Sequence, residues 1–188
     1  MLRTIPRLNG GGGGGGGGVA MKNFFSVLGI PERFDVDSSS LRKRYKSLMV
    51  ENHPDRFAAS GGAAPKDPSL ITTAYQTIGK PHLRASHLLE LGGNELSEDN
   101  QQNVLPMEFL MEIMEVREAL SEIDADDEAS GDRLRDMKEN NDERVKEVIE
   151  RLSVAFEGGD VDAARENTAI LNYYHRIEEE IKEKECVE

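Results

Sequence analysis

The sequence has little of several residue types on which many folds and sites depend. It holds one cysteine and no tryptophan among 188 residues, and aromatic side chains make up only 5% of it. A single cysteine cannot form an intrachain disulfide, so we expect no disulfide scaffold and a chain suited to a reducing compartment. No apolar run approaches the roughly 20 residues that a membrane-spanning helix needs. The sequence therefore predicts no membrane association.

Acidic residues are missing from the beginning of the chain. None precedes Glu32, whereas Arg3 and Arg7 lie within residues 1–20 together with a run of nine glycines. We expect this part to be a disordered, glycine-rich extension. It is either a mitochondrial presequence with a spacer or an extension ahead of a bacterial-type protein that starts at Met21. The first interpretation predicts the mitochondrial matrix, and the second predicts the cytoplasm of a bacterium.

The chain is acidic overall, but its charge is unevenly divided. The formal net charge is −13 at pH 7. Residues 1–91 hold 12 Lys and Arg against 7 Asp and Glu, and residues 92–188 hold 11 against 29. A strongly acidic chain is repelled by phosphates, so we expect no nucleic-acid partner. Two parts of opposite charge predict two domains with separate partners.

The tripeptide His53-Pro54-Asp55 lies at the end of a predicted basic helix. The apolar or uncharged positions of this helix recur at steps of three and four, and basic residues fill the positions between them: Leu41, Tyr45, Leu48 and Asn52, with Arg42, Lys43, Arg44 and Lys46. Pro54 disfavours helical geometry for the residue before it, so the helix is expected to stop near His53. A hydroxyl group of residues 38–40, which are serines, is expected to cap its start.

A second amphipathic helix is predicted after the tripeptide. A loop rich in Gly and Ala over residues 58–65 comes first, and Ile71, Ala74, Tyr75 and Ile78 then form one stripe. Two helices joined in this way are expected to pack as an antiparallel hairpin with the tripeptide at its exposed tip.

Other interpretations apply to the same residues. His53 and Asp55 resemble a general base and its carboxylate, but no Ser or Cys nucleophile occurs in a recognisable motif, so we do not expect an enzyme. The basic face could also be an ordinary solvated surface, which is the usual role of clustered charges on a helix.

The C-terminal half is predicted to be an all-α bundle of three helices. Their apolar stripes are Phe109, Ile113, Val116 and Leu120; Val145, Val148, Ile149, Leu152 and Phe156; and Ile170, Tyr174, Ile177 and Ile181. Turns are expected at residues 124–127 and 158–160, where acidic residues and glycines cluster. The first helix also has a second apolar arc, bordered by charges: Leu110, Met111 and Met114. This arc is either a partner interface or packs on another part of the chain.

Residues 23–91 resemble a J domain. The segment 23–30 resembles its short first helix, and residues 41–52, 53–55 and 69–79 resemble its second helix, signature loop and third helix. The resemblance implies that the loop and the basic face engage a DnaK-type heat-shock chaperone and stimulate its ATPase, through His53, Pro54, Asp55, Arg42, Lys43 and Lys46. The expected architecture is a J domain over 21–91, a linker over 92–106 and a helical bundle over 107–188.

The segments 82–91, 109–118 and 171–174 resemble the HscB family of J-type co-chaperones, and the similarity extends over about residues 22–185. The resemblance implies that an IscU-type iron–sulfur scaffold protein is delivered to the chaperone. It places scaffold-binding positions at Leu110, Met111, Met114, Glu115, Glu118 and Tyr173. Three of these form the second apolar arc, which favours the interface over internal packing.

Some features depart from the family pattern or limit what it implies. Arg56 follows the tripeptide where lysine is common, and Met114 replaces a frequent leucine of nearly the same volume. Cys186 alone cannot form the four-cysteine zinc module of some members or hold an iron–sulfur cluster, so no metal or cofactor is expected. His82 and His87 are expected to be packing or surface residues. Two alternatives stay open, a J-domain co-chaperone for a different client and an assembly protein that oligomerises through its bundle.

Overall fold

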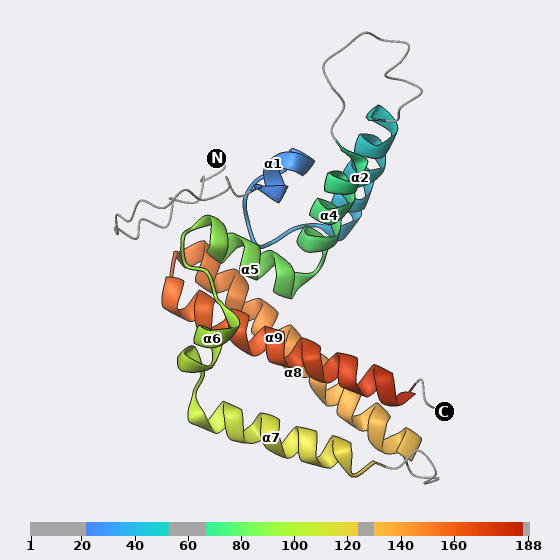
Figure 1. Ribbon diagram of the computed structural model, residues 1–188, viewed down its shortest axis with the longest axis vertical. Coiled ribbons are helices and arrows are strands. Elements are labelled where there is room, and N and C mark those ends of the chain that lie inside the picture. The colour runs from blue at the N-terminus through green and yellow to red at the C-terminus, as the bar shows by residue number, and fades with distance from the viewer. Residues whose placement is uncertain (1–21, 53–66, 124–129, 186–188) are drawn as a thin grey trace. The chain divides into compact units, whose positions relative to one another are not determined.

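The computed structural model describes residues 22–52, 67–123 and 130–185, and within these ranges every regular element is a helix. Two compact units divide between Glu95 and Leu96. The helices of the first unit are α1 Phe24–Leu28, α2 Ser38–Glu51, α4 Pro68–Gly79 and α5 Pro81–Leu91 (Figure 1). Those of the second unit are α6 Glu98–Gln101, the 3-10 helix η1 Gln102–Val104, α7 Met107–Ser121, α8 Ser130–Gly158 and α9 Val161–Glu185. The predicted all-α fold is confirmed.

In the first unit α2 and α4 form the predicted antiparallel pair (Figure 1). The rings of Tyr45 and Tyr75 stack across this pair with their centroids 4.3 Å apart. The core side chains come from α1, α2, α4 and α5 and are almost fully buried: Phe25, Leu28, Leu41, Leu48, Ile71, Ala74, Ile78, Ala85 and Leu89. The apolar stripes predicted for α2 and α4 are therefore the helix faces that pack in this core.

The start of α2 differs from the prediction. Its cap is Asp37, whose Oδ1 accepts the backbone N–H of Ser40 at 2.8 Å and the hydroxyl of Ser39 at 2.9 Å. These hydrogen bonds hold the pKa of the Asp37 carboxyl at about 2. The serines at 38–40 lie inside the first turn instead. A carboxylate fits this position because the first-turn N–H groups lack helical partners and form the positive end of the helix dipole.

The buried residue Arg84 joins three segments of the first unit. It lies on α5, and its Nε donates to the Phe34 carbonyl at 2.6 Å while Nη1 donates to the Ile78 carbonyl at the end of α4 at 2.5 Å. The guanidinium carbon lies 5.0 Å from the centre of the Phe34 ring. Burial lowers the pKa of Arg84, and the charge of Asp35 opposes this shift. Arg84 thus fixes the loop before α2 against the α4–α5 corner.

We expect Arg84→Met to destabilise the first unit by about 2–4 kcal/mol, because two buried carbonyl oxygens would lose their charged donor. Hydrogen–deuterium exchange of the full chain, followed peptide by peptide across α2 and α4, measures this loss separately from the second unit. Arg33→Met is the control, since Arg33 is exposed. Equal exchange in the two variants would contradict the role given to Arg84.

The interval 92–106, predicted to be a linker, is partly structured. Residues 98–104 form α6 and η1, which belong to the second unit. Gln101 is buried and donates through Nε2 to the Ala169 carbonyl on α9 at 3.2 Å. The polar composition of this segment suggests a linker, but a long-range hydrogen bond makes it part of the bundle.

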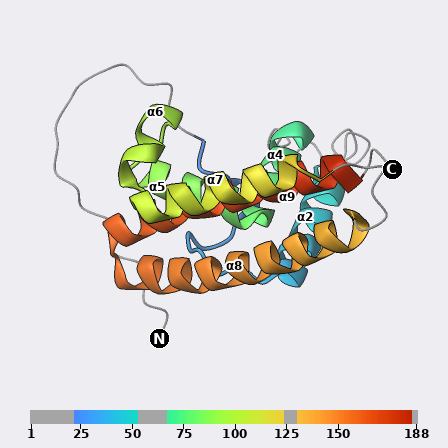
Figure 2. The same cartoon turned by 90° about the horizontal axis from the view of Figure 1, so that it is seen from below.

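The second unit is built on the hairpin of α8 and α9, and α7 runs along it (Figures 1 and 2). The predicted turn at 158–160 is confirmed. Gly159 takes a φ of 71°, which favours glycine, and Asp160 Oδ1 accepts the N–H of Ala163 at 3.0 Å to cap α9. The other predicted turn, at 124–127, lies outside the described residues. Side chains from all three helices fill the core: Phe109, Ile113, Leu120, Val148, Leu152, Phe156, Ile170, Tyr174, Ile177 and Ile181.

Candidate functional site

A basic surface lies on α2. Arg42, Lys43 and Lys46 are exposed, and at about 100° per residue they share one side of the helix, opposite Leu48. Arg44 points elsewhere, since its Nε donates to the Leu28 carbonyl at 2.9 Å. Three of the four predicted basic residues are therefore available to a partner.

The tripeptide His53-Pro54-Asp55 lies outside the described residues. It comes directly after the C-cap of α2, where Asn52 donates through Nδ2 to the Leu48 carbonyl at 2.8 Å. The predicted end of the helix is confirmed at Glu51, two residues before His53. The basic side of α2 and the tripeptide therefore follow one another along the chain.

The inner face of α7 packs on α9. The Phe109 ring meets those of Tyr173 and Tyr174 edge-on, with centroids 5.9 Å and 5.6 Å away. Further along α7, Arg117 Nη2 donates to Glu180 at 2.8 Å. Near its end Lys184 donates to the Ile123 carbonyl at 2.7 Å. These contacts determine which side of α7 faces outward.

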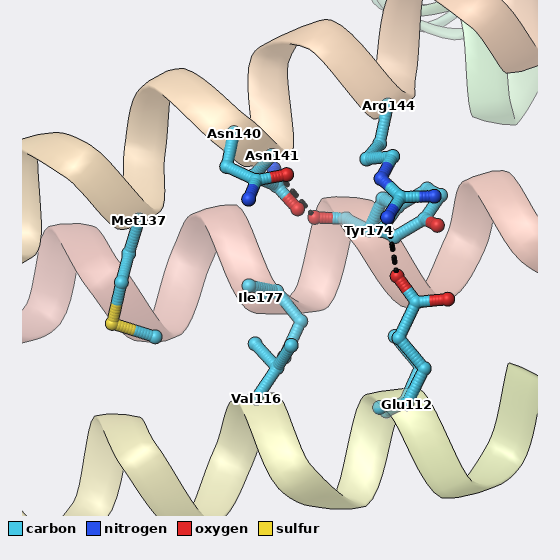
Figure 3. Close-up of a pocket in the computed structure, with 9 residues that line it drawn as sticks. Glu112, Val116, Met137, Asn140, Asn141, Arg144, Tyr174 and Ile177 are labelled. Atoms are coloured by element: carbon cyan, nitrogen blue, oxygen red, sulfur yellow. Dashed lines mark hydrogen bonds and ion pairs between the residues drawn. The ribbon is translucent and has the colours of Figure 1, made fainter.

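A cleft of about 110 Å³ lies between the three helices of the bundle (Figure 3). Glu112 of α7 and Arg144 of α8 form an ion pair of 3.2 Å at one side of it. Asn141 donates to the Tyr174 carbonyl at 3.2 Å. Burial raises the pKa of the Tyr174 hydroxyl, and the nearby Glu112 charge adds to this. The ion pair joins α7 to α8 and the Asn141 hydrogen bond joins α8 to α9, so the cleft belongs to the seam where α7 packs on the other two helices.

The outer face of α7 carries an exposed apolar row. The exposed fractions are 68% for Met107, 58% for Met111 and 70% for Met114, and Leu110 between them is half-buried. We call these four residues the α7 methionine face. Glu115 and Glu118 are exposed beside it. Within the described residues, the two methionines of the predicted second arc therefore lie at the surface of the second unit, with Leu110 half-buried between them.

Tyr173 differs from the other scaffold-binding positions implied by the resemblance. Only 7% of it is exposed. Its ring is covered by Phe109 on one side, and the Arg176 guanidinium lies 5.6 Å from the ring centre. Tyr173 therefore supports α7 from beneath and offers little surface of its own.

Met107 belongs to the α7 methionine face but not to the arc predicted from the sequence. The predicted arc begins at Leu110, but Met107 precedes Met111 by four residues and Met114 by seven. These are the helical steps that place side chains on one side. The spacing of Met107 therefore fits the arc, but Met107 is the first residue of α7, and the predicted helix begins after it.

His87 packs inside the first unit. His87 is buried, its Nε2 accepts the N–H of Phe24 at 3.1 Å and its Nδ1 lies 3.3 Å from Glu90. Its ring also packs on Phe24 and Phe25. The predicted packing role of His87 is confirmed.

Within residues 22–52, 67–123 and 130–185, no three His, Cys, Asp or Glu side chains gather as a metal site would require. None of the helices in these ranges has the length and the apolar composition of a membrane span.

Comparison with known proteins supports one family. The family model described as the HscB C-terminal oligomerisation domain matches residues 105–182. The mouse iron–sulfur cluster co-chaperone protein HscB is 32% identical over 165 residues, covering 86% of this chain and 68% of the relative. The HscB homologue of Cupriavidus taiwanensis is 33% identical over 165 residues, which cover 86% of this chain and 92% of the relative.

Solved structures agree with this assignment. The crystal structure of human co-chaperone protein HscB aligns with a TM-score of 0.74 at 31% identity, covering 89% of this chain and 84% of that one. Chaperone HscB from Vibrio cholerae aligns with a TM-score of 0.71 at 26% identity, covering 88% and 98%. The chain therefore belongs to the HscB family of co-chaperones for iron–sulfur cluster assembly, with an N-terminal J domain and a C-terminal helical domain.

Proposed function

We propose that this chain binds an IscU-type scaffold protein through the α7 methionine face and presents it to a DnaK-type chaperone, whose ATPase it stimulates. The observation that carries the proposal is the exposed apolar row on α7, at the positions where the family resemblance implies scaffold contacts. The chain acts in this scheme without catalysing a reaction itself, in keeping with relatives that are named co-chaperones.

The chemistry of α7 suits a folded protein partner. Methionine is unbranched and polarisable, so it adapts to an irregular apolar surface. Burying one such side chain fully contributes about 1.5–3 kcal/mol, which makes a row of three a sufficient centre for an interface. Glu115 and Glu118 at its border are expected to orient a partner with basic residues and to raise the association rate more than the affinity.

The chaperone surface is proposed on the other unit. Arg42, Lys43 and Lys46 supply a positive helix side for an acidic surface of the chaperone. His53, Pro54 and Asp55 supply the residues that the J-domain resemblance ties to ATPase stimulation. Because the two surfaces lie on different units of one chain, the scaffold and the chaperone can bind together.

Tethering gives the proposed coupling its physical basis. A scaffold held on α7 has a high effective concentration near a chaperone held by the J domain, so its capture and ATP hydrolysis become linked. ATP hydrolysis by the chaperone, measured with and without the scaffold, tests this. A J-domain co-chaperone for a different client would stimulate hydrolysis to the same extent in both conditions.

We place this activity in the mitochondrial matrix, with the cytoplasm of a bacterium as the alternative. Arg3 and Arg7 without acidic neighbours support the first, although residues 1–20 lie outside the described part of the chain. The relatives include proteins of both mammals and bacteria.

A further inference from the structure

Methionines are unevenly exposed in this chain. Of its seven methionines, five lie in the described residues. Met107, Met111 and Met114 expose 58–70% of their surface, whereas Met49 and Met137 are half-buried. At about 100° per residue the three exposed side chains project within about 60° of one another. The three exposed side chains therefore form a single group on one side of α7.

We propose that Met107, Met111 and Met114 form a methionine oxidation site, at which hydrogen peroxide produces sulfoxides and thereby weakens binding of the scaffold. The location of the modification, and its preference for these three methionines over Met49 and Met137, follow from exposure alone. Its effect on the scaffold rests on the proposed function.

The chemistry is a two-electron oxygen transfer. The thioether sulfur attacks one peroxide oxygen, the O–O bond breaks and an S–O bond forms. The other oxygen leaves as hydroxide, takes up the proton of the oxygen that is now bound to sulfur, and becomes water. Sulfur is oxidised and the peroxide is reduced. A methionine sulfoxide reductase reverses the change with two thiols, which become a disulfide as the sulfoxide oxygen leaves as water.

The charges around the row favour a neutral oxidant. Glu108, Glu115 and Glu118 are exposed on α7, and the second unit is strongly acidic. This field repels anionic oxidants but has no such effect on hydrogen peroxide. The site is therefore selective for a neutral peroxide.

Oxidation changes the property on which the proposed contact depends. A sulfoxide is polar and carries a strong acceptor oxygen, so burying it against an apolar partner requires a hydrogen-bond donor that the thioether did not need. With three such groups in one row, we expect the dissociation constant for the scaffold to rise by about tenfold or more.

The test uses the full chain with Cys186→Ser, which removes the thiol that would otherwise react. After graded hydrogen peroxide treatment, peptide mass spectrometry gives the order in which the five methionines of the described residues oxidise. Titration with an IscU-type scaffold then gives the dissociation constant before oxidation, after it and after reduction by methionine sulfoxide reductases A and B. The matched control replaces Met107, Met111 and Met114 by leucine, which cannot form a sulfoxide, and its dissociation constant after peroxide treatment is compared with its own value before treatment.

We expect the three α7 methionines to oxidise before Met49 and Met137, with weaker scaffold binding that reductase restores and that the leucine variant does not show. Oxidation of Met49 or Met137 at an equal or faster rate would overturn the site. Unchanged affinity after oxidation of all three would overturn its effect on the scaffold. If the untreated protein fails to bind the scaffold, the proposed function and the effect both fail, while the order of oxidation still decides the site.

Discussion

His53→Gln is expected to abolish stimulation of the chaperone ATPase and to leave scaffold binding unchanged. Truncating a hot-spot residue of an interface costs about 2 kcal/mol or more, a factor of about 30 in affinity. Glutamine keeps the polarity and much of the size of histidine but lacks the imidazole ring. The α7 methionine face belongs to the other unit, so its residues keep their surroundings. Single-turnover ATP hydrolysis and a separate scaffold titration measure the two effects.

The matched control is His82→Gln, the same change on α5 of the same unit. His82 is half-buried and lies outside the proposed chaperone surface. If the control also loses stimulation, the effect of the His53 change reflects the fold of the unit and not a contact. Loss of scaffold binding in His53→Gln would mean that the two surfaces do not act independently.

A triple alanine change at Leu110, Met111 and Met114 is expected to have the opposite effect. The scaffold dissociation constant should rise about thirtyfold or more, because much of the apolar centre of the interface is removed. Stimulation of ATPase without the scaffold should be unchanged. Helicity of α7 should persist, since alanine is the strongest helix former and both methionines are largely exposed.

Val154→Ala provides the control for the triple change. Val154 lies on α8 and is 72% exposed, so its truncation removes exposed apolar surface of the same unit outside the proposed interface. Equal weakening by both variants would contradict the assignment of the face. If the chain self-associates and the triple change abolishes this without affecting the scaffold, the methionine face serves oligomerisation instead.

The two faces of α7 were predictable because the apolar residues of each face repeat at the helical period within a short segment. Phe109 and Ile113 repeat at the helical period on one side, and Met111 and Met114 repeat on the other. The second apolar arc could either pack on another part of the chain or form a partner interface, and the resemblance to the HscB family favoured the interface. The structure resolves this for Met111 and Met114 and adds Met107 to the same row.

Other features depend on contacts between distant segments and leave no periodic signal. Arg84 looks like a surface charge on α5, yet it is buried and donates hydrogen bonds to two carbonyl groups, one of them on Phe34, fifty residues earlier in the chain. Tyr173 was expected at the interface, but its burial depends on where Phe109 docks. Gln101 similarly turns part of an expected linker into bundle structure. Such residues are satisfied by tertiary partners, which a one-dimensional pattern does not identify.

In the proposed function, one chain couples scaffold capture to the chaperone ATPase. Single-turnover ATP hydrolysis by a DnaK-type chaperone, with this protein and with or without an IscU-type scaffold, measures this coupling. We predict that the protein alone accelerates hydrolysis and that the scaffold accelerates it further, with the second increase lost in the Leu110, Met111 and Met114 variant. Acceleration that is the same with and without scaffold would show that the two are not coupled and would leave a J-domain protein with another client.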